Sequence, residues 1–195
     1  MRRYWYLAST LPSFPFGAEA PMTVSEFDEL CSRLVERHDR QVLAAVPLIM
    51  EGKDTPAASA SPLLREYFEW ERGTRNALVL LRARSLQRDP EPWIRPGVIS
   101  GDAHRAANAI HSAPDPLQAA MLFERERWIA IERLASLSAF DLDALIAYKM
   151  KLMLAERLSR LSAERGREGF ALYYQDIISA ASGRAGTVLQ SGAAT

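Results

Sequence analysis

Cysteine and long apolar runs are almost absent from this 195-residue sequence. The single cysteine, Cys31, excludes an internal disulfide and a zinc site built from cysteines, and its place in a helical apolar pattern predicts a buried thiol. No stretch reaches the roughly 18 consecutive apolar residues that a membrane-spanning helix needs, and the opening residues lack the apolar run of a secretory signal. We therefore expect a cytoplasmic protein with no membrane span of its own.

Histidine is also scarce, with only His38, His104 and His111 in the chain. His104 and His111 are seven residues apart, whereas two imidazoles that share a metal ion on one helix are typically four apart. We predict that these two lie on a helix surface or contact a partner. The sequence contains no glycine-rich phosphate loop, Gly-x-Ser-x-Gly turn or Cys-x-x-Cys pair. It therefore predicts no catalytic machinery, no metal site and no cofactor.

Neither charge sign dominates, since 24 basic residues balance 24 acidic ones. The arginines are scattered and interleaved with carboxylates, so a general nucleic-acid-binding surface is not expected. The composition, 48% hydrophobic and 25% charged, is typical of a folded globular protein. A chain of this length forms one compact domain or two small helical lobes.

Apolar residues recur at spacings of three and four through most of the chain, which predicts an all-α bundle of about six to eight helices. The N-caps expected from side-chain type and position are Thr23, Ser61, Asp102, Asp115 and Asp141. The helices are predicted over residues 23–35, 40–46, 63–87, 102–111, 117–137, 142–166 and 168–181.

Proline and small polar residues divide the chain between these helices. Residues 1–22 are rich in aromatics and proline, so we expect an irregular segment that lies over the core, with a strand or a short helix over 4–9. Residues 51–61 are predicted to form a linker or long loop. The expected parts are an N-terminal segment with the first helices (1–60), a helical core (61–181) and a disordered tail (182–195).

Two groups of polar residues lie on the long predicted helices. Tyr67, Glu71, Asn76 and Arg82 fall near the apolar stripe of helix 63–87, and we interpret them as hydrogen-bonding residues that fix helix packing, with direct partner contact as the alternative. The helix over 117–137 carries the charged residues Glu124, Arg125, Arg127, Glu132 and Arg133. Because the signs alternate, we predict a solvated, salt-bridged face there.

Two segments resemble a known family. Residues 67–84, YFEWERGTRNALVLLRAR, resemble a helix of the central-stalk C subunits (eukaryotic d) of V/A-type rotary ATPases, in which an aromatic pair precedes an acidic residue, an asparagine and an arginine. Residues 142–158 are similar to another helix of that family, in which a tyrosine and a lysine precede a glutamate followed by a basic residue. Residues 4–12 and 23–31 are also similar to a short bacterial family encoded beside V-type ATPase genes.

The resemblance implies a non-catalytic socket subunit that links the rotor axle to the proteolipid ring and supports ion transport, peripheral to the inner membrane. Its expected partners are the central-stalk axle subunits and the proteolipid ring. It implies helix-packing or partner-contact roles for the residues that match the two segments. These residues are Tyr67, Glu71, Asn76, Arg82, Tyr148, Glu156 and Arg157.

The residues leave two other function classes open. One is a cytosolic helical adaptor or regulator unrelated to ATPases, since capped amphipathic helices suit any protein contact. The other is an enzyme whose site is assembled from residues far apart in the sequence. A cluster of His38, His104 or His111 with carboxylates would favour the enzyme, and dispersed histidines would count against it.

Overall fold

The computed structural model describes residues 4–49 and 56–161, and within them it is entirely helical, with eight α-helices, one short 3-10 helix and no strand. This confirms the all-α bundle. The helices are α1 (Trp5–Thr10), α2 (Val24–Leu34), α3 (Arg37–Ala44), α4 (Pro56–Ala60), α5 (Pro62–Leu86), α6 (Gly101–His111), α7 (Pro116–Ala135) and α8 (Leu142–Arg160), with the 3-10 helix η1 at Glu91–Trp93. The helix predicted over 168–181, the end of the one predicted over 142–166 and the tail 182–195 lie outside the described residues.

The N-caps follow the predicted side chains with one exception. Thr23 forms a capping box with Glu26, whose backbone N–H donates to the Thr23 hydroxyl and whose carboxylate accepts from the Thr23 N–H at 2.7 Å. The prediction for Asp102 is wrong, because Ser100 caps α6 by accepting from the N–H of Ala103 at 3.2 Å. Asp102 instead lies in the first turn, where its charge complements the helix dipole.

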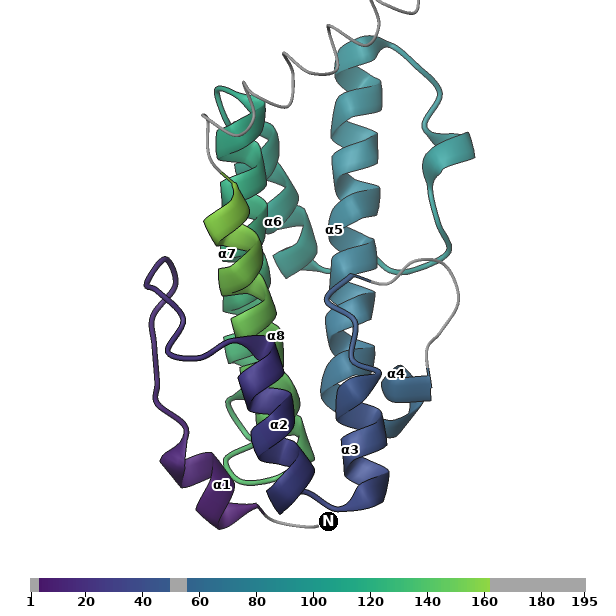
Figure 1. Cartoon of the computed structure of the whole chain (residues 1–195). Helices are drawn as coiled ribbons and strands as arrows, with labels where there is room; N and C mark the ends of the chain where they lie inside the picture. The colour runs from purple at the N-terminus through teal and green to yellow at the C-terminus, as the bar shows by residue number, and fades with distance from the viewer. Residues whose placement is uncertain (1–3, 50–55, 162–195) are drawn as a thin grey trace, which may run out of the picture. The chain divides into compact units, whose positions relative to one another are not determined.

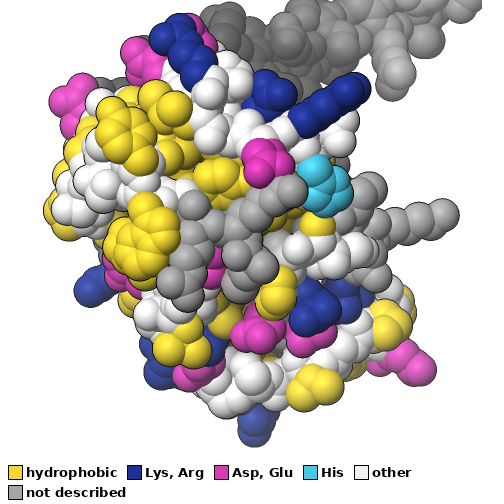
Figure 2. All heavy atoms as spheres, turned by 90° about the horizontal axis from the view of Figure 1, so that it is seen from below, with side chains coloured by type: hydrophobic (Ala, Val, Ile, Leu, Met, Phe, Trp, Pro, Cys, Tyr) yellow, Lys and Arg dark blue, Asp and Glu magenta, His cyan; other side chains and the backbone are white. Residues whose placement is uncertain are grey.

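The segment before α2 is helical only over α1, which decides between the two predicted structures for residues 4–9. Trp5 stacks on Phe140 with the ring centroids 3.9 Å apart, and Phe14 packs edge-on against Trp128. These contacts hold the proline-rich segment against the core, as expected. Figure 2 looks at the end of the molecule that carries α1, where apolar side chains gather on one side and charges of both signs are interspersed elsewhere.

The longest helix, α5, has α6 and α7 packed beside it and α4 at its N-terminal end (Figure 1). One hydrophobic core joins residues from both sides of segment 51–61, among them Phe27, Leu43, Leu64 and Ile146. The described part of that segment is not all loop as predicted. The alanine-rich stretch Pro56–Ala60 forms α4, since alanine favours helix and proline is tolerated in a first turn.

The connection from α5 to α6 runs back along α5 and is held by two residues of that helix (Figure 1). The Asn76 amide donates to the carbonyl of Arg95 at 2.7 Å and accepts from the Arg95 N–H at 3.0 Å. Gly73 lies close to the backbone of this connection, so that a Cβ atom at position 73 would be 2.7 Å from the carbonyl oxygen of Val98. The connection is therefore part of the packed structure.

Replacing Gly73 with alanine should lower the free energy of unfolding by about 1 to 3 kcal/mol, because the new methyl group meets a backbone oxygen. Helix propensity alone predicts the opposite, a gain of about 1 kcal/mol. Urea denaturation measures the sign. Gly101→Ala is the matched control, since no neighbouring heavy atom of the described residues lies within 4 Å of a Cβ at that position. A gain in stability for Gly73→Ala equal to that of the control would contradict the packing.

Candidate functional site

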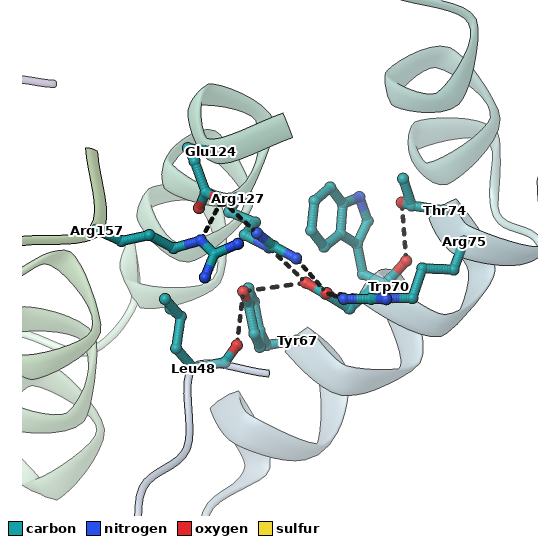
Figure 3. A network of polar contacts seen from close by, with 9 residues as sticks. Leu48, Tyr67, Trp70, Thr74, Arg75, Glu124, Arg127 and Arg157 are labelled. Carbon is teal, nitrogen blue, oxygen red and sulfur yellow. Dashed lines mark hydrogen bonds and ion pairs between the residues drawn. The ribbon is translucent and has the colours of Figure 1, made fainter. Parts of the chain in front are cut away.

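Ionised side chains from α5, α7 and α8 meet in the interior and form one network (Figure 3). Arg127 is at its centre. Its guanidinium donates from Nε and Nη2 to the two oxygens of Glu71 at 2.9 and 2.6 Å, and from Nη1 to Glu124 at 2.7 Å. Arg157 on α8 donates from Nε to the same Glu124 oxygen at 2.7 Å. The network therefore ties the three long helices together.

The α5 side of the network adds two donors to Glu71. Arg75, one turn further along, donates from Nε and Nη2 at 3.0 and 2.8 Å. The Tyr67 hydroxyl lies 3.2 Å from Glu71 and 3.3 Å from the carbonyl oxygen of Leu48, so its single proton bonds to one or the other. Glu71 is thus saturated by protein donors.

The position of Glu124 and Arg127 overturns the prediction of a solvated face. Each is only 2% exposed, whereas Arg125 and Glu132 are exposed as expected. The pattern was misleading because α7 packs on several sides. Its charged residues at positions i and i+3 face the other long helices, and the Arg127 guanidinium lies 4.1 Å from the centroid of the Phe123 ring.

The network fixes the protonation of its members. Burial raises the pKa of Glu71, but the hydrogen bonds and charge of Arg127 outweigh burial and hold that pKa below its usual value. Burial, with the nearby Glu71 charge, raises the pKa of Tyr67 well above its usual range. At neutral pH the carboxylate is therefore ionised and the phenol is a hydrogen-bond donor.

One oxygen of the network has no partner. Glu124 Oε2 is buried and accepts no hydrogen bond within the part of the chain that the structure describes, while Oε1 accepts from both Arg127 and Arg157. An unpaired buried carboxylate oxygen is destabilising. Glu124 therefore depends on its two arginines.

Three of the seven residues singled out by the resemblance lie in this network, namely Tyr67, Glu71 and Arg157. Tyr67 and Glu71 were interpreted as hydrogen-bonding residues that fix helix packing, whereas the resemblance left packing or partner contact open for Arg157. Asn76 also has a packing role, since it holds the α5–α6 connection at Arg95. Arg82 is exposed on α5 and lies outside the network.

The other two tie α8 to the N-terminal part of the chain. The Tyr148 hydroxyl donates to the carbonyl of Pro12 at 3.0 Å. The Glu156 carboxylate accepts from the backbone N–H of Val24, in the first turn of α2, at 2.8 Å. Both positions therefore serve packing between segments far apart in the sequence.

Two buried polar residues of α8 were not among the predicted site residues. Lys149 is 4% exposed and donates to both oxygens of Asp28 at 2.8 Å and to the carbonyl of Leu43 at 3.0 Å. Asp143 accepts from the Ser61 hydroxyl at 2.6 Å, and burial raises its pKa. Lys149 could have been chosen, because a lysine after a tyrosine is part of the matched segment. Asp143 has no comparable signal, since an acidic first turn is common in helices.

The three histidines and the cysteine lie on three different helices. No group of three histidine, cysteine or acidic side chains there is arranged to hold a metal ion. His38 is exposed on α3, and His104 and His111 are exposed on α6, which confirms the predicted helix-surface position of the last two. Cys31 is buried, and burial raises the pKa of its thiol to about 12. The arrangement suits packing and contact.

No protein-family model, no curated protein and no solved structure matches the chain. Within the described ranges, none of the helices has the length and apolar character needed to cross a bilayer.

Acid should weaken the structure through Glu71. Its folded-state pKa is below the unfolded value of about 4.3, so its stabilising contribution is complete above that pH and is lost as the pH falls through the folded-state pKa. Urea denaturation between pH 7 and pH 3 measures this. Glu71→Gln should flatten the acid dependence, whereas Glu69→Gln, on the exposed side of α5, should leave it unchanged. Equal acid dependence in both variants would contradict the assignment.

Proposed function

We propose that this chain is a non-catalytic coupling subunit of a bacterial V-type ATPase or ATP synthase. In this role it is a socket that receives the foot of the rotor axle and rests on the proteolipid ring, peripheral to the inner membrane on the cytoplasmic side. It supports ion transport by transmitting torque and performs no chemistry of its own. Its partners are the central-stalk axle subunits and the proteolipid ring.

The buried charge network is the observation that supports the proposal most strongly. The two segments that resemble the stalk subunits lie within α5 and α8, and they contribute Tyr67, Glu71 and Arg157 to that network. Arg127 and Glu124 of α7 complete it. A part that transmits torque must resist shear between its helices, and directional, buried ion pairs oppose such sliding because a shift would leave charges unpaired.

The state of the polar groups also supports a role without catalysis. A catalytic carboxylate needs a pKa near the working pH and access to substrate. Glu71 has neither, because it is buried, saturated by donors and held ionised by Arg127.

Copurification under gentle detergent tests the proposal. The tagged full-length chain, expressed in cells that contain the V-type complex, should bring down the axle subunits and the proteolipid ring in fixed proportion, whereas the tag alone should not. Failure to recover any stalk or proteolipid subunit would contradict the proposal. Recovery of other proteins in fixed proportion would instead indicate a cytosolic adaptor.

A further inference from the structure

The outward side of α5 carries two adjoining pockets whose walls share Arg75 and Val79. The first lies under the α5–α6 connection, and the second lies between α5 and the start of α7. Further lining residues include Trp93 and Arg95 in the first pocket and Arg82 in the second. We call the surface formed by Arg75, Val79, Arg82, Trp93 and Arg95 the arginine face.

The arginine face has an excess of positive charge. Arg82 and Arg95 are exposed, and Arg75 keeps about half of its side chain in solvent while it contacts Glu71. Among the described residues, Glu71 is the only carboxylate that lines either pocket, and it already accepts hydrogen bonds from Arg127 and Arg75. Within the same residues, no other carboxylate lines the two pockets to pair with Arg82 and Arg95.

Apolar groups lie between these charges. The Trp93 side chain is 73% exposed, and Val79 lines both pockets. The second pocket has Leu78, Ile110 and Phe123 in its wall. Tryptophan and arginine are the residues most enriched at the energetic centres of protein interfaces.

The two pockets suit side chains of a protein because both are open to solvent and the first is small. Their volumes are about 200 and 410 Å³. The first is smaller than the roughly 300 to 1,000 Å³ of a ligand site, and the second is near the lower end of that range. Arg75 and Arg82 are two turns apart on α5, about 10 Å along its axis. Carboxylates seven residues apart on a second helix have the same spacing.

We propose that the arginine face binds an acidic amphipathic helix of a partner protein. The carboxylates of that helix pair with Arg75, Arg82 and Arg95, and its apolar residues enter the two pockets beside Trp93 and Val79. This assignment goes beyond the proposed coupling role because it identifies the contact surface and the chemistry of the segment that binds. It stands on the charge and shape of the arginine face alone, so a failed copurification would not overturn it.

A synthetic 21-residue helical peptide tests the proposal. The peptide has leucines along one face of the helix and glutamates, spaced seven residues apart, next to that face. Fluorescence anisotropy of the labelled peptide with the full-length chain should show binding that weakens with salt. A peptide with glutamine in place of glutamate should bind at least about tenfold more weakly. No binding of the acidic peptide, or equal binding of both peptides, would overturn the proposal.

Charge reversal on the protein locates the site. The variant Arg82→Glu/Arg95→Glu should bind the acidic peptide at least about tenfold more weakly, with an unchanged melting temperature because both side chains are exposed. Arg84→Glu, exposed on the same helix but outside both pockets, is the matched control and should bind normally. Should the reversed variant not fold, Arg82→Gln/Arg95→Gln provides the same test with a smaller loss.

Equal affinity in the reversed variant and the control would overturn the assignment of this face. Sedimentation velocity tests the alternative that the arginine face binds a second copy of this chain. Self-association that disappears in Arg82→Glu/Arg95→Glu, without peptide binding by the wild type, would show that the face pairs two copies and would overturn the acidic partner.

Discussion

Replacing Arg127 with methionine is expected to lower the free energy of unfolding by about 3 to 5 kcal/mol. The methionine fills much of the space but leaves Glu71 with the half-exposed Arg75 and Glu124 with the half-exposed Arg157. Both carboxylates remain buried, and removing the buried partner of a buried charge is strongly destabilising. Urea denaturation monitored by circular dichroism measures the loss.

The control for this variant is Arg33→Met. Arg33 and Glu29 also form an ion pair, but their side chains are 71% and 66% exposed, so the loss should be under about 1 kcal/mol. The double variant Glu71→Met/Arg127→Met should recover part of the stability lost in Arg127→Met, because it also removes the buried carboxylate that lost its buried partner. Equal effects of Arg127→Met and Arg33→Met would contradict a buried network.

Replacing Lys149 with methionine is expected to lower the free energy of unfolding by about 2 kcal/mol. The change removes both bonds to Asp28 and takes the ammonium donor from the carbonyl of Leu43, near the end of α3, which still accepts from the N–H of Val46 at 3.2 Å. The Asp28 side chain is 42% exposed, so leaving its charge unpaired lowers stability less than leaving a fully buried charge unpaired. Thermal and urea denaturation both measure the change.

Lys151→Met is the matched control, two residues along the same helix. Lys151 pairs with the half-exposed Glu132 and bonds to no backbone carbonyl in the described residues, so its replacement should change stability by less than about 1 kcal/mol. A loss in Lys149→Met no larger than in the control would show that the tie from α8 to α2 and α3 contributes little.

Local signals were enough to predict most of the helices. The Thr23 capping box and the Ser61–Pro62 start are interactions within a few residues, and both stand in the structure as predicted. The start of α6 was harder, since both Ser100 and Asp102 are good cap residues and the sequence does not rank them. The choice depends on where the preceding connection meets α5.

The buried charges could not be predicted from local patterns. Glu124 and Arg127 have the spacing of a surface salt bridge, and only the packing of α5 and α8 against α7 shows that they are inside. Tyr67 and Glu71 were easier because they lie beside an apolar stripe. The partner of Glu71 is 56 residues away, and no periodicity within one helix indicates such a pair.

Residues that carry the proposed resemblance to the stalk family need not touch a partner directly. Tyr67, Glu71 and Asn76 are buried, and the half-exposed Arg157 bonds to the buried Glu124. By contrast, Arg82 and Arg95 are exposed on the arginine face. Changes to the first group should lower stability, and changes to the second should lower binding at constant stability. Mutations can therefore distinguish residues that stabilise the fold from residues that bind a partner.

The most direct test of the coupling role is the ATP-driven membrane potential of inverted vesicles from bacterial cells that lack this chain, followed with a potential-sensitive dye. The account predicts that ATP hydrolysis by the catalytic head generates no potential in these vesicles, and that the potential returns when the wild-type chain is restored. A full ATP-driven potential without the chain would contradict it.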